Sequence, residues 1–166
     1  MISISNRQRA RKIDLRLLEK IAADVLADLS IQEAELGIVL IGAKEMASLN
    51  ENFLQHEGPT DVITFDYRSP DESTVHCPRS TVHGRNVKRL PTWDSGPGTH
   101  LHGEIFICIP EAERQAKVFE TRWQTEVARY IIHGILHLTG HDDLEPRARK
   151  KMKREENRLV RKLAVL

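Results

Sequence analysis

Hydrophobic residues in the first quarter of the chain recur at intervals of three and four. This spacing predicts an amphipathic helix over residues 13–29, with its apolar face made by Leu15, Leu18, Ile21, Ala22, Val25 and Leu26. Residues 36–42, LGIVLIG, are short, apolar and rich in β-branched side chains, which predicts a buried strand. The segment AKEMASLNENF that follows predicts a second helix.

The second half of the chain shows the same two periods. PTDVITFDY predicts a strand over residues 62–67, and GEIFICIP predicts another over 103–110, ended by Pro110. Helices are expected over 111–121 and 124–139, and a last helix is expected to start near Leu144, with Pro146 in its first turn. This order predicts an α+β fold, in which a small mixed β-sheet packs with about five helices in one domain spanning 1–166.

A segment of different composition separates two of the predicted strands. Residues 68–102 are rich in Ser, Thr, Pro, Gly and charge, so they predict a long irregular loop. A lid over a functional site is the alternative interpretation of this segment.

Composition narrows the class of protein. The net charge of +1 over 166 residues excludes a general polycation, so any nucleic-acid binding requires a local basic patch. The two cysteines form no CxxC pair, which indicates a reducing compartment. The first residues contain no apolar leader, and no apolar run reaches membrane-spanning length. We therefore expect a cytoplasmic protein that does not enter a membrane.

The stretch HGILHLTGHDD, residues 133–143, contains the candidate chemistry. His133 and His137 stand four apart on one face of the predicted helix, where two imidazoles can bind one metal. Gly140 can end the helix in a left-handed conformation, which would turn Asp143 back toward the same metal. This layout is that of a zincin- or metzincin-like active-site helix with three protein ligands and one open position. A structural zinc site would normally recruit cysteines, and none is nearby in sequence.

Gly134 distinguishes this stretch from that of zinc peptidases. In HExxH peptidases the residue after the first histidine is a glutamate that acts as general base. Glycine at that position argues against proteolysis, although it leaves a catalytic metal possible.

Together with PTDVITF and GEIFICIPEAERQA, the histidine-rich stretch makes residues 36–158 resemble the YbeY family. The resemblance implies a single-strand-specific, metal-dependent endoribonuclease of ribosomal RNA maturation and ribosome quality control. It implies that ribosomal RNA is a partner, with the small ribosomal subunit as a candidate second partner. It also implies that His133 and His137 are zinc ligands.

The chain departs from the family pattern at three positions. The third ligand position, normally histidine, is Asp143, and the usual tyrosine of the motif is His141, which is the alternative third ligand. A carboxylate ligand leaves manganese or iron open beside zinc. Leu54 stands where the family usually has an arginine thought to serve RNA binding or catalysis, and His56 or a basic loop residue is a candidate substitute.

The resemblance places Thr60 and Asp61 beside the metal helix, so we assign them to substrate binding, with simple turn chemistry as the alternative. Asp142, Glu104 and loop histidines are candidate proton acceptors, but the sequence assigns no catalytic base. Attack on phosphorus by water or by the ribose 2′-OH both remain open.

Basic residues cluster near both ends of the sequence, in the last predicted helix and among the first sixteen residues. They form a phosphate-binding surface if they share a face, and a solvated helix face otherwise. Two other functions stay under consideration. One is a metal-dependent hydrolase of another substrate, and the other is a ribosome-assembly factor whose metal is structural.

Overall fold

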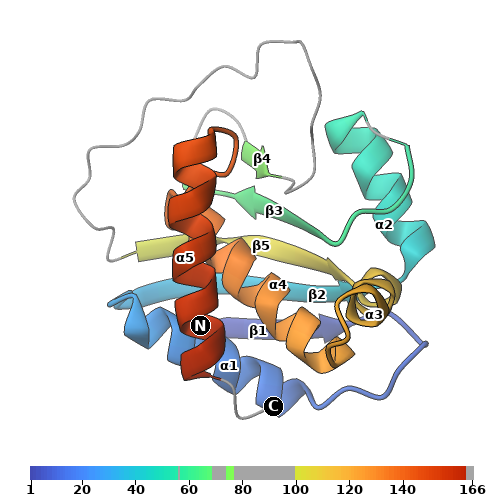
Figure 1. The fold of residues 1–166 in the computed structure, drawn as a ribbon, viewed down its shortest axis with the longest axis horizontal. Coiled ribbons are helices and arrows are strands. Elements are labelled where there is room, and N and C mark those ends of the chain that lie inside the picture. The colour runs from blue at the N-terminus through green and yellow to red at the C-terminus, as the bar shows by residue number, and fades with distance from the viewer. Residues whose placement is uncertain (56, 69–73, 77–99, 164–166) are drawn as a thin grey trace.

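The computed structural model describes residues 1–55, 57–68, 74–76 and 100–163. A five-stranded mixed sheet has the strand order β1-β2-β5-β3-β4, with bounds β1 Ile2–Asn6, β2 Glu33–Ile41, β3 Val62–Asp66, β4 Thr74–His76 and β5 His100–Cys108. β1, β2 and β5 run parallel, whereas β3 is antiparallel to both β5 and β4. Figure 1 shows this sheet behind the helices α4 and α5.

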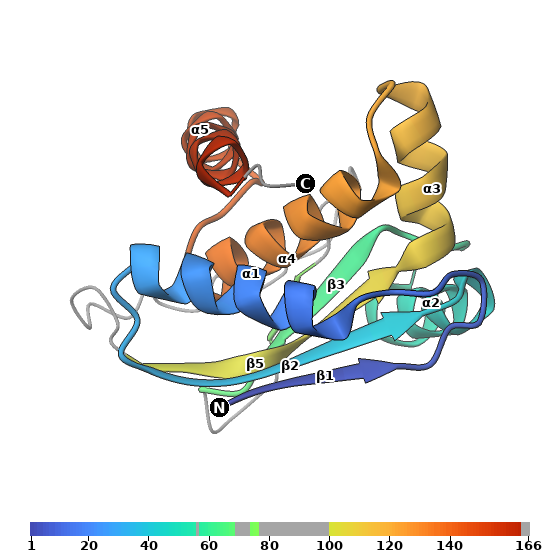
Figure 2. The same cartoon turned by 90° about the horizontal axis from the view of Figure 1, so that it is seen from below.

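Two helices, α1 (Leu15–Asp28) and α4 (Trp123–Leu138), cover one face of the sheet (Figure 2). Alternate strand residues point to this face, so Leu36, Ile38 and Leu40 pack with the apolar sides of both helices. The last helix, α5 (Pro146–Lys162), lies outside them and contributes Met152 and Leu159 to the same core. This larger core therefore fixes α4, which carries the candidate chemistry.

The opposite face of the sheet has a smaller core. Val39, Ile41, Ile63 and Phe65 pack there with Met46 of α2 (Ala43–Leu49). A π-helical turn, η1 (Asn50–Leu54), follows α2, and α3 (Ile109–Val118) follows β5 directly. None of the helices in the described part of the chain is long and apolar enough to cross a membrane.

The α+β class, the mixed sheet and the five α-helices are confirmed, with four local corrections. The predicted order lacked β1, and β2 begins at Glu33 rather than at residue 36. β4 and the first residues of β5 lie within the segment predicted to be a loop over 68–102. Pro110 does not end a strand but lies in the first turn of α3, where its missing N–H is not needed.

Strand pairing explains the extension of β2 and β5 into polar sequence. Glu33 pairs with His100 and Glu35 with His102, so the backbone hydrogen bonds of one strand are satisfied by the other. The side chains of His102 and Glu35 also lie 3.5 Å apart. Hydrophobic periodicity cannot reveal such a pairing, because it depends on a partner strand more than sixty residues away.

Candidate metal centre

Helix α4 lies close to the sheet because each of the two elements contributes a glycine to their interface, Gly134 from α4 and Gly103 from β5. A Cβ atom on Gly134 would come within 2.7 Å of Ile105 Cδ1, and one on Gly103 would come within 2.8 Å of Leu138 Cδ2. A side chain at residue 134 would therefore point into β5 and away from the metal-facing histidines. This packing gives a structural reason for the missing glutamate of the peptidase motif.

The end of α4 turns the chain back toward the histidines, as the sequence predicted. Gly140 has a φ of +88°, in the left-handed region that favours glycine. Its N–H donates to the carbonyl of His137 (2.9 Å), and the N–H of His141 donates to that of Leu136 (3.0 Å). These two bonds make a Schellman motif, which ends the helix and reverses the chain just before Asp143.

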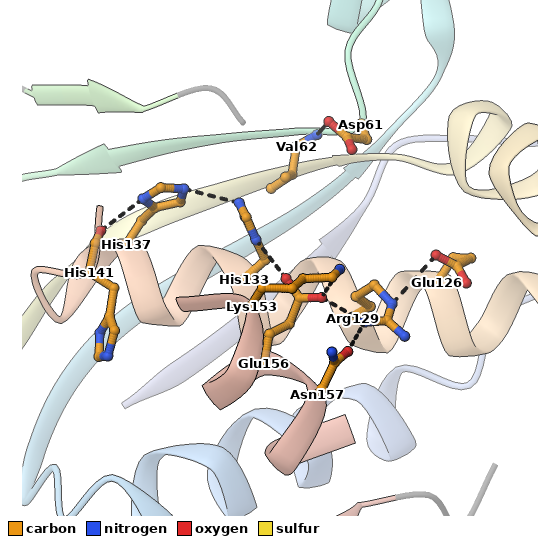
Figure 3. Close-up of polar contacts among 10 residues, drawn as sticks. All are labelled: Asp61, Val62, Glu126, Arg129, His133, His137, His141, Lys153, Glu156 and Asn157. Carbon is orange, nitrogen blue, oxygen red and sulfur yellow. Dashed lines mark hydrogen bonds and ion pairs between the residues drawn. The ribbon is translucent and has the colours of Figure 1, made fainter. Parts of the chain in front are cut away.

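Three metal-capable side chains meet at this turn. The Nε2 atoms of His133 and His137 lie 3.0 Å apart, with the two rings nearly perpendicular at 78°. One ligand atom each from His133, His137 and Asp143 all lie within 4.8 Å of one another. Figure 3 shows the facing imidazole rings on α4. The structure thus brings together the three residues that the sequence predicted as ligands.

The hydrogen bonds on the far side of each ring fix the tautomers. His137 Nδ1 is 3.1 Å from the carbonyl oxygen of His141, which can only accept, so Nδ1 carries the proton. His133 Nδ1 is likewise 2.9 Å from Glu156 Oε2 (Figure 3). When both rings are neutral, both Nε2 atoms therefore direct lone pairs at the same point.

A divalent metal fits this donor set. Two lone pairs facing each other repel unless a cation lies between them, and two imidazole ligands of one tetrahedral zinc stand about 3.3 Å apart. The observed 3.0 Å between the Nε2 atoms is close to that spacing. A carboxylate beside two imidazoles completes a set that zinc commonly uses in catalytic sites.

The carboxylate of Glu156 on α5 lies behind His133 and accepts hydrogen bonds from three side chains. This carboxylate is buried, and it accepts hydrogen bonds from Arg129 Nη1 (2.6 Å) and Lys153 Nζ (2.7 Å) as well as from His133. Burial raises the pKa of this carboxyl, but the bonds from His133 and Lys153 outweigh burial and lower it to about 2. The residue is therefore an ionised acceptor that orients His133.

Asp143 and His141, the two candidates for the third ligand, differ in orientation. Figure 3 shows the ring of His141 pointing away from the two facing histidines, while its carbonyl points to His137. Its Nδ1 lies 3.3 Å from the hydroxyl of Thr139, and burial lowers the pKa of the ring. Burial raises the pKa of Asp143, and Arg149 Nε donates to the backbone carbonyl of Asp143 (2.8 Å). The geometry places the Asp143 carboxylate, and not the His141 ring, with the histidines.

Thr60 and Asp61 lie just before β3, the strand that packs on α4. Asp61 Oδ1 accepts from the Thr60 hydroxyl (3.0 Å) and from the N–H of Val62 (3.1 Å). The carbonyl of Asp61 accepts from the N–H of Cys108, which joins this turn to the end of β5. The geometry includes the local turn bonds expected of an aspartate in this position.

Two of the candidate proton acceptors have other environments. Glu104 alternates with Gly103 and Ile105 along β5, so it lies on the opposite face of the sheet from α4, over Gly37, and accepts a hydrogen bond from Tyr67 (2.8 Å). Asp142 accepts from the N–H of Leu144 (2.9 Å) in a turn before α5. Glu104 is thereby excluded as a base at this centre.

The structure places Leu54 but only some of the residues that could replace the arginine of the family pattern. Leu54 packs against the smaller core, so an apolar contact stands where the family pattern has a cation. His56 and His83 lie outside the described residues, as do the basic residues of the segment 77–99. For His76 only the backbone is described, within β4. Arg68, a basic residue of the predicted loop that the structure does describe, pairs with Asp66.

The sequence pattern does not identify Glu156 as the carboxylate behind His133. Glu156 lies within a strongly basic helix, where it reads as one more charge of a solvated face. The spacing of Glu156 from its apolar neighbours could have identified it. Met152, Glu156 and Leu159 share the buried side of α5 at intervals of four and three. A charge at a core position of an amphipathic helix indicates a buried partner.

The fold and this site define a class: a small α+β domain with two histidines and an aspartate gathered for a metal at the end of one helix. The chain belongs to the endoribonuclease YbeY family, whose model matches residues 3–164. A relative from Dehalococcoides mccartyi is 34% identical over 146 residues, covering 87% of this chain and 84% of its own. One from Chlorobium luteolum is 29% identical over 162 residues, covering 98% and 97%. Both relatives are named endoribonuclease YbeY.

A solved structure supports the same relationship. The solution structure of a Thermotoga maritima protein matches with a TM-score of 0.59 and 25% identity, covering 98% of this chain and 89% of that one. The likeness therefore extends over the sheet and the helices together.

Proposed function

We propose that this chain is a single-strand-specific endoribonuclease that uses one zinc ion and acts in ribosomal RNA maturation and ribosome quality control, in the cytoplasm. One observation carries the proposal: His133 and His137 direct Nε2 lone pairs at one point beside Asp143, in a chain whose relatives are named endoribonucleases. The proposed partners are ribosomal RNA and the small ribosomal subunit.

His133, His137 and Asp143 are the proposed ligands, and they would leave a fourth position open. A metal held there supplies Lewis acidity toward a phosphoryl oxygen of the substrate. Glu156 holds the His133 ring from behind, and the carbonyl of His141 holds the His137 ring. Both imidazoles are thereby preorganised, so little ordering remains to be done when a metal binds.

An RNA substrate suits the residues around this centre better than a peptide does. Residue 134 has no side chain, and Glu104 lies on the far face of the sheet, so neither supplies the base that a peptidase needs. RNA carries its own nucleophile, the ribose 2′-OH, next to the phosphorus. We also assign Thr60 and Asp61 to substrate binding, because they precede the strand β3 that packs on α4. Thr60→Val should then raise KM more than it lowers kcat.

Metal content and RNA cleavage, measured on the same protein samples, test the proposal. Wild-type protein purified without chelators should contain about one zinc per chain and cleave a single-stranded RNA. His133→Ala and Asp143→Ala should lose both properties. His141→Ala is the matched control: it removes a ring from the same turn but keeps the carbonyl that His137 needs. Manganese and iron are assayed in the same samples.

A protein without bound metal after growth in zinc-containing medium would refute the proposed centre. Loss of zinc in His141→Ala with retention in Asp143→Ala would reverse the assignment of the third ligand.

One observation favours a second function, that of an RNA-binding ribosome-assembly factor with a structural metal. Leu54 packs into the smaller core, so the cation of the family pattern is missing there. This alternative predicts that removing the metal lowers the melting temperature sharply and that RNA is bound without being cleaved. The same samples, assayed for turnover, decide between the two.

A further inference from the structure

The last helix has a charge very different from that of the rest of the chain. Within Pro146–Lys162 there are nine Lys and Arg residues and two Glu residues, a formal charge of +7. The whole chain has a net charge of +1, so the residues outside α5 carry −6 together. The positive charge of the protein is therefore concentrated on one element.

The two faces of α5 differ in their contacts. Met152, Glu156 and Leu159 are buried toward α4 and α1, and Arg158 and Lys162 pair with Asp28 of α1. The outward side chains are exposed: Arg147, Lys150, Lys151, Arg154 and Arg161. Within the described part of the chain, these five form no ion pair with a carboxylate. Figure 2 shows α5 end-on, lying outside α4 and α1, so one side of this helix is turned away from the rest of the fold.

These cations form one stripe rather than a scatter. Four of them, Arg147, Lys151, Arg154 and Arg161, share a helix face about 21 Å long with the ion-paired Arg158, because residues 147, 151, 154, 158 and 161 follow one another at intervals of four and three. Neighbours of like charge at this spacing repel each other. Arg147 also lies in the first turn of α5, which has no acidic residue, and there the helix dipole disfavours a cation. These electrostatic repulsions destabilise the isolated helix, and a polyanion bound along the stripe would reduce them.

We infer that the outer face of α5 binds the phosphodiester backbone of an RNA strand, on the part of the strand that extends beyond the cleaved bond. The inference rests on the proposed function for its choice of polyanion. Arg147 follows the candidate ligand Asp143 by four residues, so the stripe begins next to the metal centre. Binding here depends on charge and not on base identity, because the contacts are to phosphates.

A charge-neutralised variant tests this surface. Arg147→Gln, Lys151→Gln and Arg154→Gln are combined in a His137→Ala background, which keeps RNA uncleaved during titration. The dependence of log K on log salt concentration for a single-stranded RNA should become shallower by about 2, at about 0.7 per lost phosphate contact. Affinity at about 0.1 M salt should fall by up to about 100-fold.

A matched control removes the same number of charges elsewhere. Lys44→Gln, Lys117→Gln and Arg122→Gln lie on or next to other helices and are exposed, and this triple variant should bind RNA like the parent. An equal loss of affinity in both triple variants would mean that only net charge matters, and the inference would fall. An unchanged salt dependence in the α5 variant would overturn it directly.

Cleavage separates this inference from the proposed function. For cleavage, the same three α5 substitutions are placed in the wild-type background. If wild-type protein cleaves RNA and this triple variant binds and cleaves a long strand equally well, only the surface is wrong. If no RNA is cleaved but salt-dependent binding is lost in the α5 variant, the surface stands and the endoribonuclease proposal fails. Binding of α5 to vesicles of anionic phospholipid in preference to RNA would identify the partner as a membrane and refute the inference.

Discussion

Glu156 Oε2 lies 2.9 Å from Nδ1 of His133, so a carboxylate of the last helix orients an imidazole of the preceding one. The same carboxylate is held by Arg129 and Lys153, which keep it ionised. The direction in which Nε2 of His133 points is thus set by the charged groups that hold Nδ1 on the other side of the ring. This relationship leads to the first prediction.

Glu156→Gln removes the charge behind His133 but keeps the size of the side chain. Metal affinity should fall about 10- to 100-fold, the usual effect of losing such a partner. The measurement is competition with a chromogenic chelator. Glu155→Gln is the control, because Glu155 pairs with Arg158 and does not contact the histidines. Unchanged affinity in Glu156→Gln would show that the His133 ring is oriented without this charge.

Gly140→Ala tests the turn that ends α4. At a φ of +88° a Cβ atom is strained, so the free energy of unfolding should fall by about 1 kcal/mol. Metal affinity should fall as well, since the turn places Asp143. Gly140→Asn is the matched variant, because asparagine tolerates the left-handed region, and it should retain more of both. Urea denaturation and chelator competition measure the two effects, and equal losses in both variants would argue against backbone strain.

Gly134→Ala sets two effects of opposite sign against each other. Alanine favours a helix by about 1 kcal/mol over glycine, whereas overpacking against Ile105 costs about 1–3 kcal/mol. We expect a net loss of about 1 kcal/mol in urea denaturation. In a double-mutant cycle, Ile105→Val removes the methyl nearest the added Cβ, so the two changes together should cost less than their sum. A stabilised Gly134→Ala protein would mean that α4 can move away from β5.

Asp28 links the pH dependence of stability to the anchoring of α5. Hydrogen bonds from Arg158 and Lys162 lower its pKa from an ordinary 3.8 to about 2. A lowered pKa contributes stability that is present above the unfolded value and is lost as the pH falls through the folded one. Asp28→Asn should therefore cost about 1 kcal/mol at neutral pH, and the difference from wild type should disappear between about pH 4 and 2.

The control for that prediction is Asp24→Asn. Asp24 pairs with Lys20 on the exposed side of α1, so its removal should cost clearly less at any pH. A wild-type advantage over Asp28→Asn that persists at pH 2 would show that the pairs with α5 do not depend on the charge of Asp28.

Much of the metal centre was predictable, because its information is local. His133 and His137 share a helix, and Gly140 and Asp143 follow within the next six residues, so helical periodicity and one turn bring them together. The bounds of α4 differ from the prediction by one residue at each end. Here local pattern and tertiary packing favour the same structure.

The features that were missed depend on distant partners. β1 has five residues, of which the first four alternate isoleucine and serine, a weak signal until it pairs with β2. Glu156 cannot be told from a solvent-exposed charge of a polar helix until α5 packs against α4. The position of Glu104 on the far face of the sheet follows from strand register, which one sequence does not reveal. Each of these three features requires knowledge of what lies opposite.

The separation of His133 and Glu156 along the chain, 23 residues, also sets an order of events in biosynthesis. At a translation rate of about 5–20 residues per second, the histidine is polymerised roughly one to five seconds before the carboxylate that orients it. A nascent chain therefore holds both imidazoles and Asp143 before it holds the carboxylate that orients His133. Tight metal binding therefore requires that α5 has been synthesised and has packed. A chain whose synthesis stops between Asp143 and Glu156 should bind zinc more weakly than the complete chain.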